Sequence, residues 1–284
     1  MLMLKLQDFN FKTTYDTYVI AEIGINHGGS LKKALEIVKS ASKTGCDAVK
    51  FQTYDSEKRA PKKKFPDLHE ILKSCQLKFS EFSEIKNYCD DLEIEFISTA
   101  FDRESIEFLE SINMNIFKIS SFDLINLELI KKISSLGKTN IFSVGMGSKK
   151  EIIKASQILE SNPKCKNAIL HCVSSYPTQV KDSNIVSINY LKNNFKDFLV
   201  GLSDHTPDIK VPSYAVALGA RIIEKHYKID EHMDCIDSSV SITQNQMKDL
   251  VSEIRFIEKI LGTEKLDVLD SEKDIVKYRR SNTL

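Results

Sequence analysis

Short apolar, β-branched runs alternate along the chain with longer segments whose apolar residues recur at helical spacing. Eight of the short runs have the length and composition of buried strands. Among the helical segments, one follows a predicted N-cap at Ser30, and another runs from Thr243 to a stop at Gly262. The predicted strands are residues 18–24, 47–53, 94–101, 116–122, 140–146, 167–175, 198–204 and 221–229.

Regular alternation of strands and helices over this length predicts a single-domain α/β fold, the (β/α)8 TIM barrel. A doubly wound open sheet is the alternative, but it would show about six strands and a GxGxxG turn, which the sequence lacks. We expect an N-terminal segment at residues 1–17, the barrel at 18–264 and a C-terminal extension at 265–284.

Two loops allow two interpretations each. The long connection after the second strand contains "EKRAPKKKF", which is either a solvated loop or a rim that draws in an anionic substrate. The "INHGGS" stretch after the first strand is either a simple turn into the next helix or a cradle for an anion.

Composition narrows the class of protein. Forty Lys and Arg balance forty Asp and Glu, so the formal net charge is zero, which argues against a nucleic-acid partner. No apolar run is long enough to span a membrane, and the N-terminus has no secretory pattern. Six scattered cysteines without a CxxC pair indicate reduced thiols. We therefore expect a cytoplasmic protein with neither nucleic-acid nor membrane partners.

Polar side chains gather where the predicted strands end. In a TIM barrel the carboxyl ends of the strands form the active-site face. Burying polar groups there is costly unless they have hydrogen-bonding or charged partners. The pattern therefore predicts a site at this face. The residues are Glu22, Lys50, Gln52, Ser98, Thr99, Lys118, Ser120, Ser121, Asp123, Ser143, His171, Ser174, Ser175, Tyr176, Ser203, Asp204, His205, Glu224, Lys225, His226 and Asp237.

Two kinds of chemistry stand out in this set. Lys50 and Lys118 lie at inward-facing strand positions, and with the neighbouring hydroxyls they suit a phosphate or phospho-carboxylate. Each hydroxyl alone is as readily explained by a bond to its own backbone. His205 and His226 end consecutive strands, where two imidazoles reach one divalent cation such as Mn, Zn or Fe; a structural role for each is the alternative.

Several motifs together carry a family resemblance. In chain order they are "AEIGINHGGSLKKALEIVKSASKTGCDAVKFQTY", "ISTAFD", "FKISSFD", "HCVSSYPT", "GLSDHT", "ALGARIIEKHYKID" and "IDSSVS". In these motifs the chain resembles the sialic acid synthase family, whose members make N-acetylneuraminic, pseudaminic and legionaminic acids. The resemblance extends over nearly the whole chain.

The resemblance implies a metal-dependent enzyme that condenses phosphoenolpyruvate with an N-acetylated hexose and releases phosphate by C–O cleavage. It implies Mn2+ as the metal on His205 and His226, with Mg2+ or Co2+ as alternatives. Glu22, Asp123 and Asp237 would be catalytic, and Gln52, Tyr176 and Asp237 would surround the sugar. Phosphoenolpyruvate would be held by Lys50, Thr99, Lys118, Ser121, Ser143 and Ser203.

The chain also departs from the family pattern. Asp123 stands where Glu is usual, Ser174 replaces Asn, and Ser238 replaces His. The "SFD" and "DSSVS" motifs favour the pseudaminate branch. Family members continue into an antifreeze-like domain that completes the partner's sugar site in a dimer. We expect a homodimer, with the present chain as the barrel without that domain. The alternatives are another phosphoenolpyruvate-condensing 3-deoxy-sugar-acid synthase, or a non-catalytic barrel that serves as a partner subunit.

Overall fold

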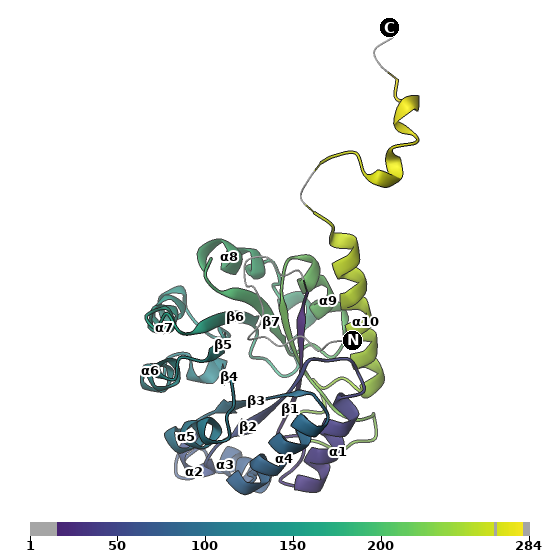
Figure 1. The fold of residues 1–284 in the computed structure, drawn as a ribbon. Coiled ribbons are helices and arrows are strands. Elements are labelled where there is room, and N and C mark those ends of the chain that lie inside the picture. Colours follow the sequence, from purple (N-terminus) through teal and green to yellow (C-terminus); the bar gives the residue numbers. More distant parts are fainter. Residues whose placement is uncertain (1–15, 264–265, 281–284) are drawn as a thin grey trace.

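The computed structural model describes residues 16–263 and 266–280. Eight parallel strands follow one another in chain order and close into a barrel, because β1 pairs with both β2 and β8 (Figure 1). This confirms the predicted single-domain (β/α)8 fold. The strands are β1 (Tyr18–Gly24), β2 (Ala48–Thr53), β3 (Glu95–Ala100), β4 (Ile116–Ile119), β5 (Thr139–Ser143), β6 (Lys166–Cys172), β7 (Leu199–Asp204) and β8 (Ile222–His226).

Helices surround the barrel and cover its outer face (Figure 1). The expected N-terminal segment lies outside the described residues, except for Asp16 and Thr17. The α-helices are α1 (Leu31–Ala41), α2 (Ser56–Arg59), α3 (Pro66–Cys75), α4 (Phe79–Asp91), α5 (Arg103–Ser111), α6 (Leu127–Ser135), α7 (Lys149–Glu160), α8 (Ser187–Asn194), α9 (Lys210–Ala217) and α10 (Gln244–Leu261).

The barrel interior has an apolar floor and a polar mouth. Successive strand residues point to opposite faces, so every second residue faces inward. On β1 the inward series runs from Tyr18 and Ile20 to Glu22, and Glu22 lies beside His226 of β8. One strand thus supplies both layers. The floor is formed by Tyr18, Ile20, Ala48, Ile97, Ile116, Ile141, Ala168, Leu170, Leu199 and Ile222.

A second and larger core lies between the sheet and the helices. The helices bury one face each, and local caps fix where they begin. Ser30 accepts a hydrogen bond from the backbone N–H of Lys33, and Thr243 and Gln246 cap each other at the start of α10. Both predicted helix starts are confirmed, and α10 ends at Leu261, directly before Gly262, whose φ of 59° suits glycine.

Several strands end earlier than predicted, which leaves chemically important residues on loops above the mouth. β4 ends at Ile119 because residues Ser121–Asp123 turn into a short 3-10 helix, η2. β6 ends at Cys172 and β8 at His226. Alternation between faces therefore stops at these points, and the loop geometry decides where the later side chains lie.

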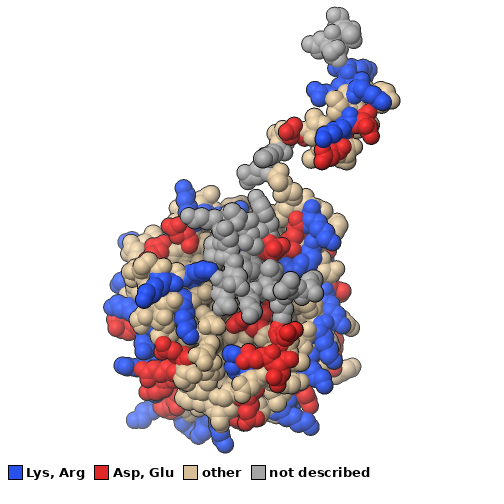
Figure 2. Space-filling model, viewed as in Figure 1, with Lys and Arg blue, Asp and Glu red and all other residues tan. Residues whose placement is uncertain are grey.

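Charged residues of both signs are interspersed over the visible face of the barrel (Figure 2). Within residues 16–263 and 266–280, no helix is both long enough and apolar enough to cross a membrane. Beyond α10, residues 266–280 are drawn away from the barrel (Figure 1).

We predict that Gly201 of β7 tolerates no side chain. A Cβ atom there would lie 2.3 Å from the Ile222 carbonyl oxygen and 2.7 Å from a Leu170 methyl group, so the two strands would have to separate. Gly201→Ala should lower the free energy of unfolding by about 1–3 kcal/mol in chemical denaturation. Lys196→Ala, at an exposed position before β7, is the control. Equal stability of the two variants would contradict this packing.

Candidate active site

A polar cavity of about 70 Å³ opens at the carboxyl ends of the strands. Each of the eight strands, or the loop that follows it, contributes to its wall. This is the face at which TIM barrels place their active sites. The lining residues are Glu22, Lys50, Gln52, Arg59, Thr99, Phe101, Lys118, Ser120, Ser121, Phe122, Ser143, Cys172, Ser174, Tyr176, Ser203, His205, Glu224 and His226.

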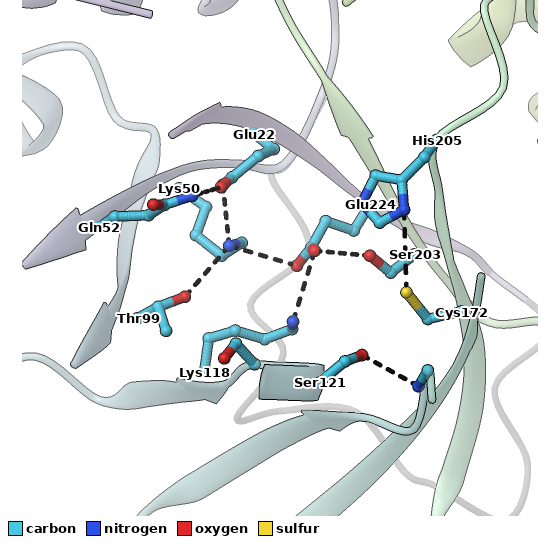
Figure 3. A network of polar contacts seen from close by, with 12 residues as sticks. Glu22, Lys50, Gln52, Thr99, Lys118, Ser121, Cys172, Ser203, His205 and Glu224 are labelled. Carbon is cyan, nitrogen blue, oxygen red and sulfur yellow. Dashed lines mark hydrogen bonds and ion pairs between the residues drawn. The ribbon is translucent and has the colours of Figure 1, made fainter. Parts of the chain in front are cut away.

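Two lysines and two carboxylates form a buried network at the centre of this cavity (Figure 3). Lys50 Nζ lies 2.9 Å from Glu22 Oε2 and 3.7 Å from Glu224 Oε2. Lys118 Nζ lies 3.4 Å from the other oxygen of Glu224. The Glu224 carboxylate therefore lies between both lysines, and each of the four buried ionisable groups lies beside one of the opposite type.

The two carboxyl groups differ in their protonation. Burial raises the pKa of Glu22, and the nearby Lys50 only partly opposes this effect. Burial also acts to raise the pKa of Glu224, but Lys118 and Lys50 together outweigh it, and the net pKa is lowered. Glu224 thus stays ionised between the lysines, while Glu22 is the carboxyl that more readily holds a proton.

The predicted hydroxyl groups surround this network. Thr99 accepts a hydrogen bond from Lys50 at 3.2 Å, and Ser203 donates one to Glu224 at 2.9 Å. Ser121 accepts from the Gly145 N–H at 3.0 Å. The buried Ser143 hydroxyl has no hydrogen-bond partner within the described part of the chain. All six residues predicted to hold phosphoenolpyruvate line one cavity.

The two histidines lie together on the adjacent wall, with ring centroids 5.4 Å apart. His205 Nδ1 lies 2.8 Å from the Val173 carbonyl oxygen, which can only accept, so Nδ1 carries a proton and Nε2 is the ring nitrogen that this bond leaves free. The buried His226 Nδ1 has no hydrogen-bond partner among the described residues. The same residues include no cluster of three or more His, Cys, Asp or Glu that could hold a metal.

The residues predicted around the sugar lie at the mouth. The half-exposed Tyr176 ring lies 4.1 Å from the His205 ring, centroid to centroid, and Gln52 donates to Glu22 at 3.1 Å. Asp237 and Asp123 are not part of the cavity wall. Asp237 Oδ2 lies 3.5 Å from His226 Nδ1, and Asp123 accepts a hydrogen bond from the cavity-lining Ser120 at 2.7 Å.

Four cavity residues are not among the predicted polar residues at the strand ends: Arg59, Phe101, Phe122 and Cys172. Glu224 was among the predicted residues without a specific role, and it faces the cavity because it lies two residues before His226 on the same strand. Arg59 belongs to the "EKRAPKKKF" cluster, whose other basic residues are exposed. The Cys172 sulfur lies 3.9 Å from His205 Nδ1.

Four of the polar residues at the strand ends bond to the surrounding structure and are not part of the cavity wall. Ser98 bonds to Thr53, and His171 contacts the Ser183 carbonyl. Asp204 and Lys225 form a buried ion pair at 2.6 Å. They lie on neighbouring strands, each one residue before a histidine.

The "INHGGS" loop forms a turn and contributes nothing to the cavity wall. Gly28 and Gly29 have positive φ, and a Cβ on Gly29 would lie 2.3 Å from the Ser74 carbonyl oxygen. Asn26 contributes in another way. Its amide donates to the Tyr227 carbonyl and the Ser241 hydroxyl, and its oxygen accepts from the Asp237 N–H, so it anchors the loop that carries Asp237.

The barrel and its polar mouth define the chain as a (β/α)8-barrel enzyme. Within this class the chain belongs to the NeuB family, whose model matches residues 37–266. It is 34% identical over 275 residues to the pseudaminic acid synthase of Campylobacter jejuni, covering 93% of this chain and 80% of that protein. It is 35% identical over 265 residues to the N,N'-diacetyllegionaminic acid synthase of the same organism, covering 87% and 78%.

A solved structure is similar throughout the barrel. The N-acetylneuraminic acid synthetase of Leptospira borgpetersenii, crystallised with citrate, superimposes with a TM-score of 0.89 at 37% identity. The similarity covers 93% of this chain and 91% of that one. These findings confirm the resemblance to sialic acid synthases.

The buried Asp204–Lys225 pair leads to a prediction about stability. Lys225→Met leaves the Asp204 carboxylate buried without its cation and should cost about 3–5 kcal/mol of unfolding free energy. The double variant Asp204→Asn/Lys225→Met removes both charges and should regain most of that loss in urea denaturation. A double variant no more stable than the single one would contradict this account.

Proposed function

We propose that this chain condenses phosphoenolpyruvate with the open-chain aldehyde of an N-acetylated aldose, forming a 2-keto sugar acid and releasing phosphate. One observation carries the proposal. In a member of the NeuB family, a single cavity joins two buried lysines and four hydroxyl residues to a pair of adjacent histidines. The first group suits an anion with phosphate and carboxylate groups, and the second suits a divalent cation.

The anionic substrate binds through the chain's own cations and hydroxyls. Lys50 and Lys118 hold the negative groups of phosphoenolpyruvate, with Thr99, Ser121, Ser143 and Ser203 as hydrogen-bonding partners. The buried Ser143 hydroxyl, which has no hydrogen-bond partner among the described residues, supports this assignment, because a buried polar group without a partner is costly unless a ligand satisfies it.

The histidine pair fits the implied metal. His205 Nε2 is left free by the contact of Nδ1 with Val173, and His226 Nδ1 is buried without a hydrogen bond from the described residues. His205 and His226 would hold Mn2+, or Mg2+ or Co2+ in its place. When bound, the ion supplies a Lewis acid for the aldehyde carbonyl.

The bond changes follow from the substrates. The C3 carbon of phosphoenolpyruvate forms a bond to the aldehyde carbon, and the aldehyde oxygen takes up a proton. Water then adds at C2 and loses one proton. The hydroxyl so formed gives its remaining proton to the departing phosphate as the C2–O bond to phosphate breaks, which leaves the 2-keto group. Glu22 handles the proton at the aldehyde oxygen, because burial raises its pKa and keeps a proton available. Asp123 and Asp237 act at the mouth, where Gln52 and Tyr176 orient the sugar.

A pseudaminate-type sugar is the favoured second substrate. The motifs around Asp123 and Asp237 resemble that branch, and the cavity wall includes the rings of Phe101, Phe122 and Tyr176. Such rings suit the methyl and acetamido groups of a deoxy, diacetamido hexose. The enzyme is further proposed to act in the cytoplasm and to form a homodimer. Sedimentation of the purified protein would test the homodimer.

Phosphate release provides the first test. With Mn2+ and phosphoenolpyruvate, the chain should release phosphate only when an N-acetylated aldose is added, and fastest with a deoxy, diacetamido hexose. Lys118→Met should lower kcat/KM for phosphoenolpyruvate about 10- to 100-fold, since one hydrogen bond to a charged group is lost. Lys154→Met, at an exposed position, is the control. If the chain binds phosphoenolpyruvate but releases no phosphate with any aldose, the result would favour a non-catalytic barrel. If it releases phosphate only with phosphorylated aldoses, the result would favour a 3-deoxy-sugar-acid synthase.

Metal binding is tested separately from turnover. His205→Ala should abolish saturable Mn2+ binding measured by electron paramagnetic resonance, because one of two imidazole ligands is lost. His232→Ala removes an exposed histidine outside the cavity and should bind Mn2+ like the unaltered protein. Unchanged Mn2+ affinity in His205→Ala would show that the two-histidine site is wrong.

A further inference from the structure

Arg59 differs from the other basic residues of its segment. Lys58, Lys62, Lys63 and Lys64 are exposed, and Lys58 and Lys62 pair with Glu104 and Glu70 at the surface. Arg59, the last residue of α2, is half-buried and lines the cavity. The long connection after β2 is therefore mostly a solvated loop, but it delivers one guanidinium to the site.

Aromatic rings hold this guanidinium in place. Its central carbon lies 3.8 Å from the centroid of the Phe101 ring and 4.7 Å from that of Tyr54. A planar guanidinium stacks on such rings, whereas an ammonium group is a compact charge without a face. Phe101 follows β3 and Tyr54 follows β2, so two strands determine where Arg59 lies.

The guanidinium in turn determines which way the Gln52 amide faces. Arg59 NH1 donates a hydrogen bond to Gln52 Oε1 at 2.8 Å. The amide nitrogen must then point the other way, and it donates to Glu22 Oε1 at 3.1 Å. A flipped Gln52 amide would place its oxygen against the Glu22 carboxylate and would also lose the hydrogen bond from Arg59.

Glu22 is thereby held from two sides. Gln52 bonds one carboxylate oxygen, and Lys50 pairs with the other at 2.9 Å. Gly24 leaves the room for this arrangement: a Cβ there would lie 3.2 Å from Gln52 Nε2, 3.2 Å from Glu22 Oε1 and 3.3 Å from Asp237 Oδ2. A continuous chain of polar contacts therefore runs from Arg59 through Gln52 and Glu22 to Lys50.

We propose that Arg59 is a positioning residue for the aldose half of the cavity: it locks the Gln52 amide so that its N–H groups hold the Glu22 carboxyl in place. The inference rests on the proposed function, in which Glu22 handles the proton of the aldehyde and Gln52 lies beside the sugar. Arg59 acts through Gln52 and is not required to touch the substrate.

This role predicts a specific kinetic signature. Arg59→Met keeps an unbranched apolar stem against Phe101 but removes the hydrogen bond to Gln52. It should lower kcat/KM for the aldose about 10- to 100-fold, the value of one charged hydrogen bond, while phosphoenolpyruvate binding measured by calorimetry stays close to that of the unaltered protein. Arg59→Lys retains a donor and a charge and should restore part of the activity. Lys58→Met, one residue earlier and exposed, is the matched control.

A double-mutant cycle separates this role from direct contact with the sugar. If Arg59 acts through Gln52, Arg59→Met should have little further effect once Gln52→Ala is present. Independent, multiplying effects of the two changes would overturn the inference, as would an Arg59→Met enzyme with unaltered aldose kinetics. A chain that releases no phosphate with any aldose would contradict the proposed function as well, whereas an active chain indifferent to Arg59→Met would contradict only this inference.

Discussion

Four buried ionisable side chains at the centre of the barrel, Lys50, Lys118, Glu22 and Glu224, constrain everything around them. A buried charge is tolerated only when it is paired and hydrogen-bonded, so these side chains fix one another's positions. The hydroxyls of Thr99 and Ser203 complete the set from two further strands. The mouth is thereby ordered before any substrate enters, which is the condition for holding reacting groups in productive geometry.

Much of this arrangement could be predicted from the sequence, because barrel closure turns strand order into spatial proximity. The two lysines were recognisable because a lysine is rarely buried inside a barrel unless it is paired. The two histidines were recognisable because they lie at the ends of neighbouring strands. Glu224 obeys the same parity. Its importance comes from two lysines on distant strands, however, and no local pattern in the sequence shows that contact.

Other features depended on the folded chain. The outer face of the sheet is as buried as the inner one, because helices cover it. The polarity of a residue at a strand end therefore did not reveal that Asp204 and Lys225 point outward. Arg59 lies on a four-residue helix within a long connection. Its place at the cavity follows from stacking on Phe101, a residue about forty positions away, which no periodicity predicts. Asp123 lies at the rim because β4 ends early.

The pairing of Glu224 with both lysines has a consequence for how an anion is captured. The Glu224 carboxylate already offsets part of the charge of the two lysines, and the chain as a whole carries no formal net charge, so we expect little long-range attraction of an anion. An incoming anion gains its binding energy by exchanging contacts inside the cavity, at distances shorter than the Debye length, where dissolved salt screens weakly. Capture should therefore depend on the shape and chemistry of the anion and remain almost indifferent to the ionic strength of its surroundings.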